Sequence, residues 1–204
     1  MRSIALTVTL VSLAAFAGAQ AVAPAPETFT LRPTASRFTW SATTNQGPIT
    51  TGQAAFAVGG ELQLEVSMDA AGIHAARFLR SDAFVRPDLS GTFSGQQGTG
   101  FAVSHPRLSF SSDAFPVNHD GTFTTTLNVR FTNGRLQVAP PLGPGWLMVL
   151  DGQSLRAVVV SGTLRQDGAI LRLDVPIVLD YDFGFGAVSG TVHMPGALVA
   201  GMRL

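Results

Sequence analysis

The chain has 204 residues with 13 basic and 13 acidic side chains, so its formal net charge is zero. Every basic residue is arginine, and the absence of lysine excludes Schiff-base chemistry, a Walker-A lysine and a Ser-x-x-Lys pair. The absence of cysteine excludes disulfides, thiolate catalysis and cysteine-ligated metals. Because there is no basic excess, the composition also argues against nucleic-acid binding, which depends on neutralising phosphates.

The first 19 residues have the features of a secretory signal peptide. Arg2 precedes an apolar stretch at residues 4–17, and Ala17-Gly18-Ala19 places small residues around a cleavage site. This stretch is shorter than an uncleaved membrane anchor, which needs about 20 residues. We expect removal of residues 1–19 on export, an Ala/Pro spacer at residues 20–27, and a single domain at residues 28–204. The expected location is the periplasm or the extracellular medium, with no integral membrane segment after cleavage.

Alternation of apolar and polar residues with a period of two dominates the chain after residue 28. Residues 36–43, 61–69, 123–131 and 169–185 all show it, and a last strand is expected around Val188, Val192 and Met194. Pro176 lies within the longest alternating run and has no main-chain N–H to donate. We therefore expect a bulge or a sheet edge at Pro176.

Four dipeptides are typical of hairpin turns: Gly59-Gly60, Asn133-Gly134, Asp151-Gly152 and Asp167-Gly168. One segment breaks the alternation, because apolar residues of 73–84 share a face at helical spacing. These residues predict one short helix, which ends before Arg86-Pro87. The Gly/Ser/Thr/Gln-rich residues 89–100 predict a loop.

Together these patterns predict an all-β, antiparallel, closed or nearly closed barrel of about eight to ten strands with one short helix. A β-sandwich is the alternative, since one-sided alternation suits both architectures. The long strands favour the barrel.

No catalytic motif is evident in the sequence. It contains neither Gly-x-Ser-x-Gly nor His-Glu-x-x-His, and its four histidines have no metal-ligand spacing. Asp180 and Asp182 share one strand face, which we interpret as an exposed acidic stripe rather than a glycosidase pair. Hydroxyl-rich outer faces such as residues 124–126 suggest a sugar-binding sheet, but Trp40 and Tyr181 lie on apolar faces and are not available for stacking. We expect no enzymatic activity, no metal and no cofactor.

Several short motifs within about residues 28–138 resemble the YceI-like family of exported lipocalin-like barrels. They are Thr-Leu-Arg-Pro-Thr-Ala-Ser-Arg-Phe-Thr-Trp at 30–40, Gly52 with Phe56 and Gly60-Glu-Leu, Leu-Arg-Ser-Asp-Ala-Phe at 79–84, His-Pro-Arg-Leu-Ser-Phe-Ser-Ser at 105–112, and Gly-Thr-Phe-Thr-Thr-Thr-Leu at 121–127. The sequence departs from the family at Ala75-Ala76, where an Arg-Asp pair is usual, and at Phe78, where a histidine is usual. The resemblance implies a lipocalin-like barrel that binds a polyisoprenoid or another long apolar chain.

The leading functional prediction is an exported, non-catalytic protein that holds an isoprenoid or fatty-acid-like lipid inside the barrel. The same-face apolar residues predicted to line this interior are Phe38, Trp40, Phe56, Leu62, Leu64, Val66, Phe84, Phe110, Leu127, Val129, Phe131, Leu171, Leu173 and Val175. The alternative is a secreted β-sandwich that acts as a surface or adhesion module, with a filled core and no small ligand.

A connected apolar cavity of several hundred cubic ångströms, about the size of a ligand pocket, favours lipid binding over the surface module. An eight-stranded outer-membrane barrel is a third possibility. It needs girdles of interfacial aromatic residues, and two tryptophans and one tyrosine argue against it.

Overall fold

The computed structural model describes residues 26–51, 54–94, 98–140, 144–185 and 188–204, and no helix occurs among them. The predicted signal peptide and spacer residues 20–25 lie outside these ranges; the sheet begins at Pro26, two residues before the predicted start of the domain. The strands are β1 (Pro26–Leu31), β2 (Arg37–Thr39), β3 (Ser41–Thr44), β4 (Gly47–Thr51), β5 (Ala55–Asp69), β6 (Gly72–Arg86), β7 (Leu89–Phe93), β8 (Gly100–Ser111), β9 (Phe115–Pro116), β10 (Thr122–Ala139), β11 (Trp146–Val149), β12 (Val158–Asp167), β13 (Ile170–Phe185) and β14 (Val188–Arg203).

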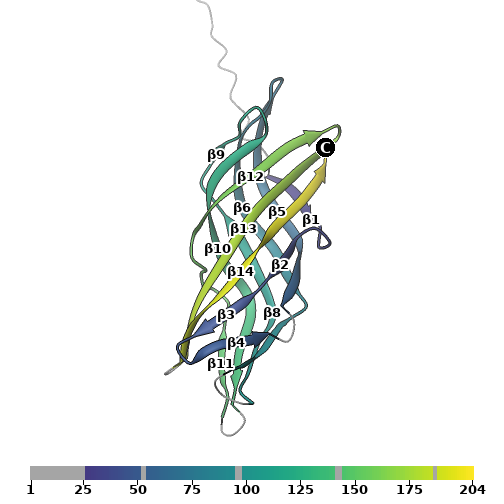
Figure 1. The fold of residues 1–204 in the computed structure, drawn as a ribbon. Helices are drawn as coiled ribbons and strands as arrows, with labels where there is room; N and C mark the ends of the chain where they lie inside the picture. Colours follow the sequence, from purple (N-terminus) through teal and green to yellow (C-terminus); the bar gives the residue numbers. More distant parts are fainter. Residues whose placement is uncertain (1–25, 52–53, 95–97, 141–143, 186–187) are drawn as a thin grey trace, which may run out of the picture.

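Eight of these strands form a closed ring of antiparallel neighbours, in the order β1-β5-β6-β8-β10-β12-β13-β14 and back to β1. The long strands run obliquely from one end of the molecule to the other (Figure 1). Short strands β3, β4 and β7 connect β14 to β8 at the lower end, and β11 adds to β10. The all-β, antiparallel prediction is confirmed, although the sheet has 14 strands rather than about eight to ten.

The alternation identified in the sequence is the inside-outside alternation of the sheet. In β13, Leu171, Leu173 and Val175 are buried, and β13 pairs with β14 along its whole length. Pairing of β13 with β12 ends at Thr163 opposite Asp174. Pro176 lies two residues further along β13, on the side no longer paired with β12, so the predicted sheet edge at this proline is confirmed.

The predicted helix at residues 73–84 is wrong, because these residues belong to β6. Pairing of β6 with β5 shifts register twice, around His74 and around Leu79. Each bulge adds one residue and moves the following side chains to the opposite face. Ala76 and Phe78 therefore face inward before the second bulge, and Ala83 faces inward after it. This change of phase removes the alternation and imitates helical spacing.

The hairpin predicted at Asn133-Gly134 is also wrong. Both residues lie within β10, where the pairing with β8 shifts register on either side of Asn133. Gly134 has a φ of +131°, a conformation that favours glycine. A bulge with glycine at positive φ uses the same residues as a tight hairpin, so the dipeptide alone does not distinguish them.

Gly59-Gly60 likewise lies inside a strand, not at a turn. It marks the point where β5 changes partners: Ala55–Ala57 pair with β2, and Gly60–Glu65 pair with β1. Gly60 has a φ of +108°, and a Cβ atom there would lie 2.1 Å from the carbonyl oxygen of Asp82. Glycine is therefore required at this position by both conformation and space.

The remaining turn and loop predictions have mixed outcomes. The hairpin at Asp167-Gly168 is confirmed, since Asp167 pairs with Ile170. Asp151-Gly152 forms a turn, but the flanking β11 and β12 both pair with β10 and not with each other. The predicted loop at 89–100 begins with strand β7, and residues 95–97 lie outside the described ranges.

Candidate functional site

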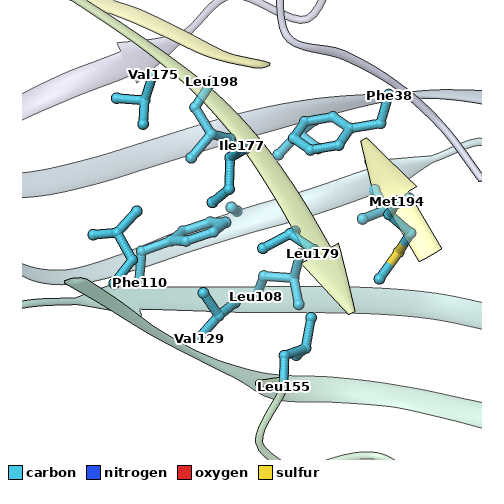
Figure 2. Close-up of a cluster of buried hydrophobic side chains, with 14 of the residues drawn as sticks. Phe38, Leu108, Phe110, Val129, Leu155, Val175, Ile177, Leu179, Met194 and Leu198 are labelled. Carbon is cyan, nitrogen blue, oxygen red and sulfur yellow. The ribbon is translucent and has the colours of Figure 1, made fainter. Parts of the chain in front are cut away.

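The interior of the strand ring contains the residues predicted to bind an apolar chain. With one exception, all of them are buried, with exposed fractions of 8% or less. Side chains from β2, β8, β10, β13 and β14 point toward one another and fill the space between the strands (Figure 2). The facing of these residues is therefore as the sequence predicts.

Phe84 is the exception. It lies on the outer face of β6, between the inward-facing Ala83 and Val85, and is only partly buried. The Phe84 ring packs over Gly59, and a Cβ atom added at Gly59 would lie 2.7 Å from the ring. The guanidinium group of Arg86 lies 5.2 Å from the centroid of the same ring. Phe84 is thus a wrong member of the predicted interior set, because the bulges in β6 reverse the facing of this part of the strand.

Aromatic residues that were not among the predicted set contribute much of the packing. Phe101 stacks on Trp40 at 5.8 Å between ring centroids and contacts Phe183 at 5.7 Å. Phe115 stacks on Phe123 at 4.7 Å. Apolar and polar residues do alternate around Phe101 in the sequence. The bulge at residues 105–107, however, divides the alternating pattern of β8 into two short parts, and neither part alone predicts a strand of this length.

An apolar cavity remains in this core, but it is small. Its volume is about 20 Å³, and its walls include Phe56, Phe131, Leu136, Tyr181 and Met194. One water needs about 10–15 Å³ by this measure, and a ligand pocket typically has about 300–1,000 Å³. This cavity therefore has no room for a lipid chain, and the buried side chains around it pack closely.

The outer face of β13 and β14 carries a network of polar side chains at the predicted acidic stripe. Arg156 makes two hydrogen bonds to the carboxylate of Asp182, at 2.7 and 2.8 Å, and Thr191 donates a third at 2.6 Å. Asp180 lies 2.7 Å from Nδ1 of His193. The two carboxylates do lie on the outer face, as predicted, but each is matched by a donor from a neighbouring element.

These hydrogen bonds, from Thr191 first and then Arg156, hold the pKa of Asp182 below its ordinary value. Because the folded-state pKa is lowered, the stabilisation is present above the unfolded-state pKa of about 3.9 and is lost as pH falls through the folded-state value. Thr191→Val is expected to raise the pKa of Asp182, as measured by NMR titration of its carboxyl carbon. Thr43→Val, at the exposed residue paired with Thr191, is the control and should leave it unchanged. An unchanged titration in Thr191→Val would contradict the assignment.

The histidines do not converge. His74 lies 3.8 Å from Asp69, His193 contacts Asp180, and the main-chain N–H of His105 donates to Asp88. Within the described ranges, no three His, Asp or Glu side chains are close enough together to hold a metal ion. The same ranges contain no helix of the length and hydropathy needed to span a membrane.

A polar groove lies on the outer surface where β12 and β13 separate. It has a volume of about 550 Å³, and its lining includes Thr122, Thr124, Ser161 and Asp174. The hydroxyl groups of Thr124 and Ser161 are 2.9 Å apart and already hydrogen-bonded to each other. The groove is open, and its aromatic residue, Phe123, is buried in the core, so it offers no ring for stacking on a sugar.

Comparison of the chain with family models, with curated proteins and with solved structures found no match. The resemblance to the YceI-like family therefore remains a prediction, based on the short motifs named above.

Proposed function

We propose that the eight-stranded ring is a lipocalin-like β-barrel and that the protein is an exported, non-catalytic binding module that acts through its outer surface. The observation that carries this proposal is the closely packed apolar core, in which the described cavity of about 20 Å³ has no room for a chain. Barrels of about eight strands are just wide enough either to fill with side chains or to hold one small ligand. The residues described here favour the filled case.

Binding of an isoprenoid or fatty-acid chain inside the barrel is the competing proposal, supported by the mainly apolar interior. Burial of each methylene group contributes about 0.8 kcal/mol. In a filled interior, however, the chain must displace core side chains. Exposing each of them to water costs about 1.5–3 kcal/mol of burial free energy. Exchange of one apolar group for another gives little net affinity, so the filled barrel is expected to reject the chain.

A cavity-forming variant tests the proposal. Phe131 is buried, lines the cavity and lies with its ring centroid 5.1 Å from that of Tyr181, so Phe131→Ala enlarges this cavity by removing a large side chain from its wall. Engineered apolar cavities of this kind bind benzene. We expect benzene to raise the melting temperature of Phe131→Ala and not that of wild type. Val159→Ala, at a residue 69% exposed on the outer face, is the matched control and should behave as wild type.

A fluorescent long-chain fatty acid provides the second arm. The proposal expects no saturable binding to wild type or to Val159→Ala. Should Phe131→Ala not fold, Met194→Ala opens the same cavity with a smaller loss of volume. Saturable, one-to-one binding of the fatty acid to wild type would overturn the proposal in favour of the lipid-binding barrel.

A further inference from the structure

The wall of the barrel has a seam along one side of β13. Pairing of β12 with β13 ends at Thr163 opposite Asp174, and Pro176 has no main-chain N–H with which to continue the ladder. Beyond Asp174, no described strand pairs with β13 on the side away from β14. The polar groove between β12 and β13 marks the start of this seam, since Asp174 and Pro176 line it.

The segment that closes the seam is held mainly by β10. We call residues 146–156, which include β11, the strap. Its strand β11 pairs with β10. After β11, the main-chain N–H groups of Leu150, Gly152 and Leu155 all donate to carbonyl oxygens of β10. The strap is therefore attached to β10 along most of its length.

The contacts between the strap and β13 are weaker. Among the described main-chain hydrogen bonds, one crosses the seam, from the N–H of Arg156 to the carbonyl oxygen of Asp180 at 3.1 Å. The Arg156 side chain also binds Asp182, but these side chains are 60% and 49% exposed, and exposed ion pairs contribute little to stability. The hydroxyl of Tyr181 donates to Sδ of Met148 at 3.4 Å, and a thioether is a weak acceptor.

Apolar side chains close the seam from the inside. Leu150 and Leu155 of the strap are buried, and Figure 2 shows Leu155 directed toward Leu179 of β13. Leu150 and Tyr181, from the two sides of the seam, both line the apolar cavity of about 20 Å³. The cavity therefore adjoins the seam. Burial of the two leucines favours the closed state, because opening exposes them to water.

We propose that the strap opens at β13 while it stays paired with β10, and that the opened seam is the route by which a small apolar molecule reaches the cavity. Opening breaks the main-chain hydrogen bond of Arg156 and its ion pair with Asp182, and it leaves the hydrogen bonds to β10 intact. The inference goes beyond the proposed function, since the seam can open whether or not the native interior admits a ligand.

Amide hydrogen exchange of the wild-type protein, followed by NMR, tests the opening. Protection from exchange, corrected for the intrinsic rate of each amide, reports local opening, so the Arg156 amide should exchange about tenfold or more faster than that of Leu155. Asp182→Asn removes the ion pair and should speed exchange of Arg156 by about two- to fivefold, with Leu155 unchanged. Asp167→Asn is the matched control, because it removes another exposed ion pair, with Arg172 at 3.0 Å, and should change neither amide.

The rate at which benzene enters the cavity tests the route. In Phe131→Ala, which enlarges the cavity, NMR exchange between free and bound benzene gives the association rate. Adding Asp182→Asn should raise this rate by about two- to fivefold, and adding Asp167→Asn should not. Met194→Ala provides the cavity if Phe131→Ala does not fold.

Three results would overturn the inference. Equal protection of the Arg156 and Leu155 amides would show that the strap does not separate from β13 on its own. Loss of protection of both amides in Asp182→Asn would show that the strap also leaves β10. An association rate of benzene unchanged by Asp182→Asn would place the entry route elsewhere. The proposed function fails on a different result, saturable binding of a fatty acid to wild type.

Discussion

Gly60→Ala is expected to unfold the protein or to lower its stability by about 3 kcal/mol or more. Gly60 has a φ of +108°, and its added Cβ would lie 2.1 Å from the carbonyl oxygen of Asp82, a backbone atom that moves only with β6. Backbone strain alone costs about 1–3 kcal/mol, and the steric overlap adds to it. Because β5 changes partners at Gly60, the substitution also disturbs the pairing of β5 with β1. Urea denaturation measures the change.

Two other glycines separate these contributions. Gly72 has a φ of +117° with no neighbouring atom within 4 Å of an added Cβ, so Gly72→Ala reports the backbone cost alone. Gly184 has free space and an ordinary φ, so Gly184→Ala should be close to neutral or slightly stabilising. The expected order of destabilisation is Gly60→Ala, then Gly72→Ala, then Gly184→Ala. Equal stabilities of the Gly60 and Gly184 variants would contradict the described path of β5.

Leu127→Asp is expected to abolish folding near neutral pH. Leu127 is fully buried in β10, and loss of a buried leucine costs about 2–5 kcal/mol before any charge is considered. A carboxyl group there must also be desolvated without a partner, or stay protonated at a further cost. These costs are comparable with the total stability of about 5–15 kcal/mol of a typical domain. Circular dichroism and thermal melting should show loss of the cooperative transition.

Thr126→Asp is the matched control, since Thr126 is the neighbouring residue and is exposed on the outer face. Its melting temperature should stay within a few degrees of wild type, as is usual for a surface substitution of about 0.5 kcal/mol or less. A folded Leu127→Asp, or an unfolded Thr126→Asp, would show that β10 faces the other way.

The facing of many strand residues was predictable, because burial of one face of a strand requires apolar residues at alternate positions in the sequence. Leu62, Leu64 and Val66 of β5, and Leu171 and Leu173 of β13, face the core as the alternation predicts. A strand with one buried face must place apolar residues at every second position, so facing follows from the local pattern.

Bulges explain most of the wrong predictions. Each bulge in β6 shifts the alternation by one residue, and the resulting pattern over residues 73–84 resembles a helix. The glycines at 59, 60 and 134 lie at irregular positions inside long strands. The same dipeptides also occur in tight hairpin turns. Local sequence shows that the backbone is unusual at these points, but the pairing partner decides whether the chain reverses direction.

Ring closure and the volume of the interior depend on distant residues. Ser36 shows this: its buried hydroxyl donates to the carbonyl oxygen of Val199 and accepts from the same residue's N–H, across most of the chain. The alternation indicated which side chains point inward but not how closely opposite walls approach. The small size of the described cavity therefore required the three-dimensional structure.

Native mass spectrometry of the protein purified from its own host, combined with solvent extraction and lipid analysis, tests the filled interior most directly. The proposed filled barrel predicts a single species at the mass of the polypeptide alone and an extract without stoichiometric lipid. A one-to-one lipid adduct that survives purification, and that appears as an isoprenoid or fatty acid in the extract, would contradict it.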